Sequence, residues 1–212
     1  MYCQKVLILE RKFCFLIILF VMHINNNNLS KKILSWYDNN KRILPWRISQ
    51  KSKKNHYYRI LSEFMLQQTQ VKTVIPYFNN FVKKVPSLKA LSKSKEKKIL
   101  KLWEGLGYYK RAKNLLKTSK ILIKKYNGKI PNNFLKLKEL PGIGDYTANV
   151  LLALTYNQPR IGIDANVKRV ISRLNNINTI EDSLSLFKTD LGKDEISPII
   201  CILIPFFIKS LI

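Results

Sequence analysis

Apolar residues recur along the chain at intervals of three and four, which is the spacing of helices with one buried face. A first helix is expected to begin at Ser30, whose side chain can cap it, and to end before Pro45. One or two helices, broken near Pro76, are expected over residues 57–85. Two more are expected over residues 87–128, with the sequence GLGYY between them and a glycine at their end.

The following stretch, residues 134–157, predicts a helix, a tight turn with two glycines and a second helix. Asp164 is expected to cap a further helix, IDANVKRVISRL. Before residue 150, no stretch alternates apolar with polar residues in the way that a half-buried strand requires. The body of the chain is therefore expected to be mainly α, built from short amphipathic helices.

Both ends of the chain depart from this pattern. An apolar run from Phe13 to Met22 follows several basic residues, but it is too short to span a bilayer and no small-residue cleavage site comes after it. We expect residues 1–21 to be an upstream extension and Met22 to be the true start. We expect residues 22–174 to form the functional region. Residues 175–212, which end in an apolar, proline-interrupted segment, are expected to be an aberrant tail left by a frameshift or truncation.

Charge narrows the choice of partners. The 212 residues include 38 Lys and Arg against 13 Asp and Glu, which gives a formal net charge of +25. Such an excess is typical of proteins that bind a polyanion, either nucleic acid or an anionic membrane surface. The lysine-rich codon bias of an AT-rich genome accounts for the excess equally well, so the charge needs support from a specific site.

The turn LPGIGDY, residues 140–146, is the first candidate for such a site. Gly142 and Gly144 allow backbone conformations and close approaches that other residues do not. The helix that follows points its free N–H groups at the turn, and such an end binds anions. An ordinary connection between two helices, without a ligand, is the alternative. The basic chain, together with Lys168 and Arg169 in the next helix, favours an anion.

The sequence LPGIGDYTA resembles the helix-hairpin-helix turn of the base-excision DNA glycosylases related to endonuclease III, which grips the DNA backbone through main-chain N–H groups. Four further stretches agree with that superfamily in the same order: SWYDNNKRILPWR, LSEFMLQQTQVKTVIPYF, LWEGLGYYKRAKNL and IDANVKRVISRL. Together they are most similar to the A/G-specific adenine DNA glycosylases of the MutY type, over residues 30–174. The resemblance implies an endonuclease III-like fold, incomplete at its C-terminus, in a monomeric protein.

Two carboxylates carry the chemistry that the resemblance implies. Glu63 lies in an apolar helical stretch, where desolvation favours a protonated carboxyl group, and it matches the family's catalytic glutamate; a solvated surface glutamate is the alternative. Asp164 matches the carboxylate that faces the sugar, and Asn166 matches a supporting position. Tyr146 stands where the bifunctional branch has a lysine that attacks the sugar, with a half-buried packing residue as the alternative. Base removal without lysine-driven strand cleavage is therefore expected.

The resemblance also implies how DNA is held. Gln68 and Tyr108 match residues that the family inserts into the duplex while the target base is extruded. For Tyr108, a core position beside Trp103 is the alternative. Trp46 and Arg47 match the lining of the adenine pocket, although NHYYRILSE lacks the Asp-Pro that usually precedes this helix. The resemblance assigns contacts to the DNA backbone to Leu140, Gly142, Gly144, Lys168 and Arg169.

Members of this family usually hold a [4Fe-4S] cluster with four cysteines in the spacing C-x6-C-x2-C-x5-C. Cys3, Cys14 and Cys201 provide neither that motif nor a zinc site nor a disulfide framework, so no metal ligand is assigned and a reducing cytoplasm fits. The expected partner is double-stranded DNA with adenine opposite 8-oxoguanine or guanine, at a bacterial nucleoid and not at a membrane. A non-catalytic DNA-binding remnant, a bifunctional endonuclease III-like glycosylase/lyase and a membrane-anchored protein are the alternatives.

Overall fold

The computed structural model describes residues 35–48, 51–52, 54–158, 160, 162–166 and 169. These residues belong to two compact units. The larger unit runs from Ile43 to Gly162, and the described residues up to Arg42 and from Ile163 onward belong to the smaller one. The expected upstream extension, true start and aberrant tail lie outside the described residues.

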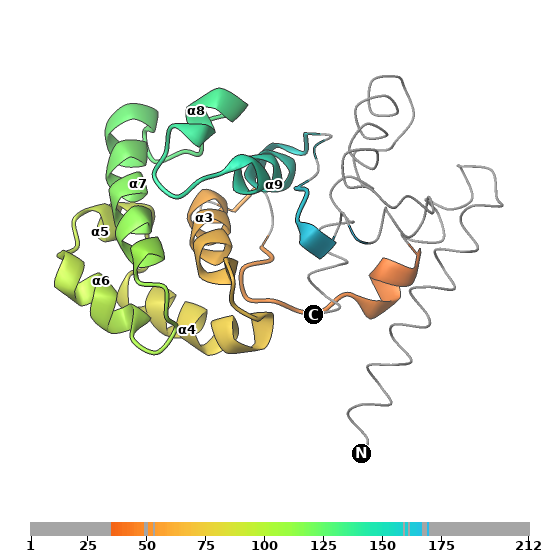
Figure 1. The fold of residues 1–212 in the computed structure, drawn as a ribbon, viewed down its shortest axis with the longest axis horizontal. Helices are drawn as coiled ribbons and strands as arrows, with labels where there is room; N and C mark the ends of the chain where they lie inside the picture. Colours follow the sequence, from red (N-terminus) through yellow and green to blue (C-terminus); the bar gives the residue numbers. More distant parts are fainter. Residues whose placement is uncertain are drawn as a thin grey trace, which may run out of the picture. The chain divides into compact units, whose positions relative to one another are not determined.

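The larger unit is a bundle of helices that surrounds α3 (Asn55–Leu66). Helix α3 contacts α4 (Val71–Lys84), α7 (Lys110–Tyr126) and α9 (Asp145–Tyr156), as Figure 1 shows. Because α3 has neighbours on several sides, nine of its twelve residues are buried. This helix is therefore the element on which the rest of the unit is assembled.

Three shorter helices complete the larger unit. Helix α5 (Leu88–Ser92) packs against α7, α6 (Glu96–Trp103) packs against α4 and α7, and α8 (Phe134–Lys138) packs against α9. The described part of the chain contains no strand, so the mainly α fold is confirmed there. None of the helices within it is both long and apolar enough to cross a membrane.

Local signals in the sequence set several helix boundaries. The Ser87 side chain caps α5 by accepting a hydrogen bond from the Ala90 N–H (3.1 Å), and Asn133 caps α8 by accepting one from the Lys136 N–H (3.0 Å). Helix α7 ends where Asn127 adopts the left-handed conformation, directly before the glycine that the sequence indicated as its end.

Two boundaries differ from the expected ones. The chain breaks at residues 67–70 and not near Pro76, which lies inside α4. A proline removes one helical hydrogen bond, and burial of α4 residues such as Phe78 on the core side outweighs that loss. The stretch before GLGYY forms two helices and not one. Ser94 ends the first of them, because its N–H and its hydroxyl both donate to carbonyls at the end of α5 (2.9 Å each).

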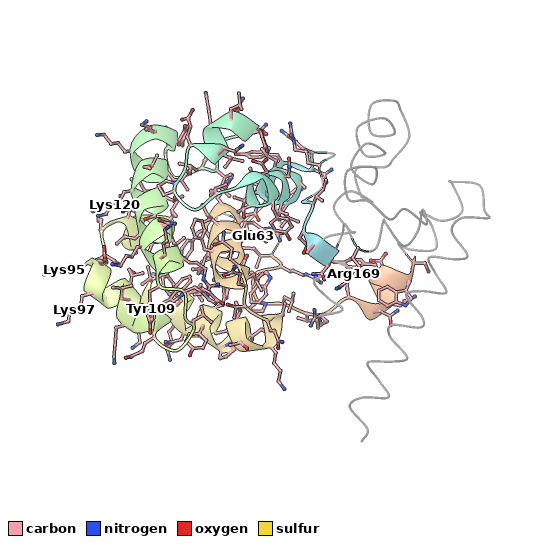
Figure 2. The ribbon with its side chains drawn as sticks, in the orientation of Figure 1. Glu63, Lys95, Lys97, Tyr109, Lys120 and Arg169 are labelled. Carbon is pink, nitrogen blue, oxygen red and sulfur yellow. The ribbon has the colours of Figure 1, made fainter. Side chains whose placement is uncertain are left out.

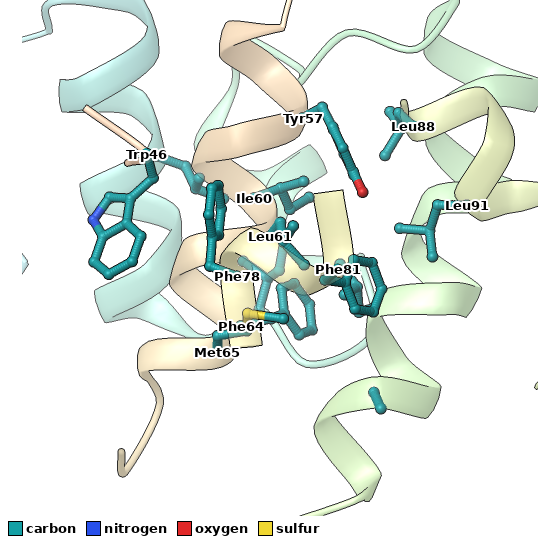
Figure 3. Close-up of a cluster of buried hydrophobic side chains, with 14 of the residues drawn as sticks. Trp46, Tyr57, Ile60, Leu61, Phe64, Met65, Phe78, Phe81, Leu88 and Leu91 are labelled. Carbon is teal, nitrogen blue, oxygen red and sulfur yellow. The ribbon is translucent and has the colours of Figure 1, made fainter. Parts of the chain in front are cut away.

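The core lies between α3 and the helices around it, and Figure 3 shows the part that α3 shares with α4 and α5. Trp46, which precedes α3, packs its ring against Phe78 at 5.2 Å in an edge-on arrangement. Each fully buried side chain of this size contributes about 2 kcal/mol through the hydrophobic effect. The fully buried members in Figure 3 are Ile60, Leu61, Phe64, Met65, Phe78, Phe81 and Leu91.

Candidate DNA-binding and active site

Glu63 is a buried acidic residue on α3. It is 5% exposed, and its neighbours Ser62 and Phe64 are buried as well. In Figure 2 it lies within the helical body, whereas Lys95 and Lys97 extend outward from the α6 region. The alternative of a solvated surface glutamate is therefore wrong. A carboxyl group kept away from bulk water is the kind of group that general acid catalysis uses.

The turn between α8 and α9 packs against α3 and α7. Gly142 has a φ of +82°, and a Cβ at this position would lie 2.8 Å from Phe64 Cε1 and 2.9 Å from Asn114 Cβ. Only glycine fits both the backbone conformation and the space. The Thr118 hydroxyl donates to the Pro141 carbonyl (2.9 Å), which ties the turn to α7. The turn's outer side is exposed, and the first N–H groups of α9 follow it.

Tyr146 lies in the first turn of α9. Its hydroxyl oxygen is buried although the residue as a whole is partly exposed. The ring packs against Gly162, where a Cβ would lie 2.9 Å from Tyr146 Cε2. A phenol at this position cannot form the imine that a lysine would form with a sugar aldehyde.

Asp164 and Asn166 belong to the smaller unit. Asn166 Nδ2 donates to Asp164 Oδ2 (3.4 Å), and Arg169 Nη2 donates to Asn166 Oδ1 (2.6 Å). The Asn166 amide therefore links the Asp164 carboxylate to the Arg169 guanidinium. Asp164 directly precedes a helical stretch, in agreement with the expected start of that helix. Lys168 lies outside the described residues.

Two loops of the larger unit carry the residues expected to enter DNA. We call residues 67–70 and residues 105–109 the wedge loops. Gln68 in the first loop is exposed and has a φ of 56°, and Tyr108 in the second is 61% exposed and has a φ of 49°. The alternative that Tyr108 is a core residue is therefore wrong. Two exposed side chains on left-handed backbone are unusual outside glycine and asparagine, and such strain gathers at functional sites.

Arg111 is a residue of this region that the sequence reasoning missed. It is 7% exposed, and its guanidinium donates hydrogen bonds to carbonyls of both wedge loops and of the end of α3. Burial lowers the pKa of Arg111, but an arginine side chain stays charged at neutral pH. An arginine two residues after GLGYY was the available signal, but nothing in the sequence identifies its partners.

A further hydrogen bond joins the first wedge loop to the glycine turn. Gln67 Nε2 donates to the Gly142 carbonyl (3.1 Å). Leu140, which begins the turn, is 2% exposed and belongs to the core, so it contributes backbone and not a side chain to the surface. The structure thus brings together the turn and the wedge loops, three segments that lie far apart in the sequence.

The predicted adenine-pocket residues precede α3. Trp46 is 3% exposed and is part of the core. Arg47, the next residue, is partly buried. The Arg47 N–H donates to the Leu44 carbonyl (3.0 Å), which closes a short turn at this point. The structure therefore places a buried tryptophan there, and a role in binding adenine remains a prediction.

Lysines dominate the surface around α6 and the start of α7. A hollow of about 610 Å³ beside α6 has Tyr109 in its wall, one residue after Tyr108. Two acidic residues there are held by lysines, Glu104 by Lys101 (2.6 Å) and Glu96 by Lys113 (3.2 Å). The hollow is lined by Lys95, Lys97, Lys98, Leu100, Lys101, Glu104 and Tyr109. This surface suits a polyanion.

The cysteines of this sequence do not provide the four ligands of a [4Fe-4S] cluster. The described part of the chain contains no group of three or more His, Cys, Asp or Glu side chains that could hold a metal ion. The three cysteines of the sequence all lie outside that part, and a four-cysteine cluster needs one more. We therefore assign no step to an iron-sulfur cluster.

Comparison with known proteins shows the superfamily to which the chain belongs. The sequence model described as "HhH-GPD superfamily base excision DNA repair protein" matches residues 61–190, more than half of the chain. The chain belongs to this superfamily.

Within it, the resemblance to adenine DNA glycosylases is confirmed. The adenine DNA glycosylase of Buchnera aphidicola subsp. Baizongia pistaciae (strain Bp) is 49% identical over 147 residues, which are 69% of this chain and 41% of that protein. The Rattus norvegicus enzyme is 36% identical over 177 residues, 79% of this chain and 34% of that protein. The chain thus spans about two fifths or less of the length of these relatives.

Solved structures support the fold. A thermostable thymine-DNA glycosylase matches with a TM-score of 0.66 and 22% identity, over 85% of this chain and 81% of that one. Endonuclease III in a non-covalent DNA complex matches with a TM-score of 0.63 and 20% identity, over 89% of this chain and 85% of that one. At these identities the likeness bears on the fold alone, and it confirms the expected endonuclease III-like fold.

Proposed function

We propose that this chain carries the catalytic region of a DNA glycosylase that hydrolyses the N-glycosidic bond of adenine mispaired with 8-oxoguanine or guanine. The observation that carries the proposal is the buried carboxyl group of Glu63, on the helix that also supports the glycine turn and one wedge loop. The names of the similar proteins, adenine DNA glycosylases, support the choice of base.

The proposed reaction uses two carboxyl groups in opposite protonation states. Glu63 donates its proton to N7 of adenine, so that the C1′–N9 bond breaks with its electron pair leaving on a neutral base. Asp164, ionised and bonded to Asn166, stabilises the positive charge that develops on the sugar. Water then bonds to C1′ and gives a proton to the Glu63 carboxylate, which restores the acid and leaves an abasic sugar in an uncut strand. Tyr146, in place of a lysine, supports this monofunctional outcome.

Adenine must leave the base stack before it can react, which costs a few kcal/mol. The wedge loops supply the side chains that compensate, because Gln68 and Tyr108 are exposed and lie on two loops that both accept hydrogen bonds from Arg111. The glycine turn offers backbone N–H groups to phosphate, and the lysines around α6 add attraction for the duplex. The proposed partner is thus double-stranded DNA.

Residues 22–174 are the proposed functional region, and the bacterial cytoplasm, at the nucleoid, is the proposed location. The proposed region includes all the residues that the proposed chemistry and DNA contacts use, from Trp46 to Arg169. Chromosomal DNA as substrate accounts for the location.

The test is a single-turnover assay on a duplex with adenine opposite 8-oxoguanine, in which base loss is read as an alkali-labile site. The native chain is expected to form this product, and Glu63→Gln is expected to lower the rate at least about a hundredfold because the proton donor is lost. Binding of the duplex should survive in the variant. Full activity of Glu63→Gln would sink the assignment.

Glu96→Gln is the matched control, because Glu96 is a half-exposed residue in a surface ion pair with Lys113 (3.2 Å). Its activity should equal that of the native chain, since surface ion pairs contribute little. A non-catalytic DNA-binding role is the competing candidate, favoured by the three cysteines of the sequence, which do not form the four-cysteine motif that the family usually has. Tight binding by the native chain without any alkali-labile product would support that role instead.

A further inference from the structure

Arg111 lies in the first turn of α7 and is 7% exposed. A buried guanidinium is costly unless its N–H groups are hydrogen-bonded. Nη1 donates to the carbonyls of Met65 (2.8 Å), Phe64 (3.3 Å) and Gln67. Nη2 donates to the carbonyls of Leu106 and Gly107 (3.2 Å each). One side chain thus bonds to the end of α3 and to both wedge loops.

Two of these carbonyls stand at corresponding positions in the wedge loops. The Gln67 carbonyl belongs to the peptide group that leads into Gln68, and the Gly107 carbonyl belongs to the one that leads into Tyr108. Gln68 and Tyr108 are both in the left-handed conformation. That conformation is strained for a residue with a Cβ, so it persists only where neighbouring contacts fix it. Arg111 fixes the preceding peptide group in both loops.

The aromatic side chains around Arg111 strengthen the second loop. The guanidinium carbon lies 5.3 Å from the centre of the Tyr108 ring and 5.6 Å from that of Trp103, both within the range of cation–π attraction. Trp103 Nε1 also donates to the Gly107 carbonyl (3.1 Å). The Tyr108 ring is therefore oriented by the same cation that holds its backbone, although 61% of the residue is exposed.

We propose that Arg111 is a positioning residue that joins the two wedge loops, so that Gln68 and Tyr108 enter the duplex as one unit during base extrusion. The Gln67 side chain extends this unit to the glycine turn through its bond to the Gly142 carbonyl. The spacing between the two inserted side chains and the phosphate-binding turn is then fixed before DNA arrives. This inference rests on the proposed function, because it assigns a role within base extrusion.

The variant Arg111→Lys distinguishes a role in joining the two wedge loops from the simple presence of a buried positive charge. The guanidinium holds several carbonyls in a fixed planar arrangement, whereas an ammonium is a compact point charge on a flexible stem. Arg111→Lys therefore keeps the charge and loses the link between loops. Arg59→Lys is the matched control, because Arg59 is also buried (8% exposed) and bonds to Asn55 (3.1 Å) and to the Ile48 carbonyl (3.3 Å), away from both wedge loops.

The first measurement uses the protein without DNA. Amide hydrogen exchange reports the opening of local segments. In Arg111→Lys, exchange is expected to speed up together at residues 67–70 and 105–109, with α9 unchanged. In Arg59→Lys, exchange at the wedge loops should stay native. Unchanged exchange in both loops, or faster exchange in one loop alone, would overturn the link.

The second measurement follows base extrusion in the Glu63→Gln background, where the chemistry is blocked. The probe is a duplex with 2-aminopurine next to the adenine opposite 8-oxoguanine, whose fluorescence rises on unstacking. Adding Arg111→Lys is expected to lower the extrusion equilibrium about tenfold, which corresponds to about 1.4 kcal/mol, with circular dichroism unchanged. In a double-mutant cycle, Gln68→Ala and Tyr108→Ala should be non-additive with Arg111 present and additive in the Arg111→Lys background.

The outcomes separate the two proposals. Native-like extrusion by a folded Arg111→Lys chain, or equal coupling in both backgrounds, would overturn the positioning role and leave the proposed function intact. Absence of adenine release by the native chain, with faster exchange in both wedge loops of Arg111→Lys, would overturn the proposed function and leave the link between the loops intact.

Discussion

At the scale of a single residue, the proposed function assigns to Tyr146 the choice between base removal alone and base removal with strand cleavage. Its ring packs against Gly162 and its hydroxyl oxygen is buried in the first turn of α9. A buried phenol donates and accepts hydrogen bonds but does not attack a sugar carbon as an amine does. Its contribution to the proposed reaction is therefore support for the catalytic groups through hydrogen bonding.

Tyr146→Phe tests this contribution, because it removes the hydroxyl and keeps the ring that packs against Gly162. We expect the single-turnover rate of adenine release to fall about tenfold, the usual effect of losing one hydrogen bond near developing charge. The folded structure should persist, as judged by circular dichroism. The control is Tyr126→Phe, at the far end of α7, which should react at the native rate. Equal rates for both variants would leave Tyr146 with a packing role only.

Residues differ in how well the sequence predicted them. The burial of Glu63 was predictable, because apolar residues surround it in the sequence and α3 is central. The role of Arg111 was not, because its partners are main-chain carbonyls at the end of α3 and in the first wedge loop, 40 or more residues away, and in the second wedge loop beside it. Carbonyl groups are present in every residue, so no pattern of side chains identifies those that converge on one arginine.

At the scale of elements, the glycine turn depends on the two helices behind it. Phe64 of α3 and Asn114 of α7 approach Gly142 so closely that a methyl group would lie within 3 Å of both side chains. Thr118 of α7 holds the adjoining Pro141 carbonyl. The conformation that presents the N–H groups is thus set by packing between helices and not by the turn sequence alone.

Gly142→Ala should be destabilising for two reasons, the positive φ and the contact with Phe64 and Asn114. We expect the free energy of unfolding to fall by about 1–3 kcal/mol, measured by urea denaturation, and DNA affinity to fall because the turn is displaced. Gly144→Ala is the matched control. A Cβ at Gly144 meets nothing within 4 Å, so a loss of less than about 1 kcal/mol is expected there. Equal losses in the two variants would contradict this account.

Helix types were easier to predict than helix ends. The periodic pattern identified the helical stretches from residue 57 to residue 156, but it merged α5 and α6 into one helix, and the caps Ser87 and Asn133 were not predicted. The break at residues 67–70 was not predicted, because those residues resemble the helix around them and the break depends on Arg111 and the glycine turn. Tertiary contacts, and not local preference, decide that boundary.

At the scale of the whole larger unit, His56 connects distant parts of the chain. On α3, its Nδ1 accepts a hydrogen bond from the Ile130 N–H (3.1 Å), and its ring meets the edge of Tyr156 of α9 at 5.8 Å. Burial, with a smaller contribution from Lys129, lowers the pKa of His56 below its ordinary value of 6.5. The folded state therefore prefers the neutral imidazole, whose Nδ1 remains an acceptor.

Stability should depend on pH through this residue. Between the lowered pKa of His56 in the folded state and its ordinary value of 6.5, the unfolded chain binds more protons than the folded chain. The free energy of unfolding therefore rises with pH in this window. The contribution of His56 is complete above about pH 6.5 and is lost progressively as the pH falls below that value. Urea unfolding at pH 7.5, 6.5 and 5.5 measures the slope. His56→Asn keeps an acceptor near the Ile130 N–H and removes the titration, so its stability should vary less over this range. An identical slope in both proteins would exclude His56 as the cause.

Three proposed roles depend on neighbouring residues of helix α3, so a change in the register of this helix affects all of them. Glu63, Phe64 and Met65 are consecutive, and they supply the proposed proton donor, the support behind Gly142 and a carbonyl that Arg111 grips. An α-helix turns by about 100° per residue. Inserting or deleting one residue in α3 would therefore misdirect chemistry, backbone grip and base extrusion in a single event. Insertions and deletions should therefore be tolerated in the loops between helices but not within α3.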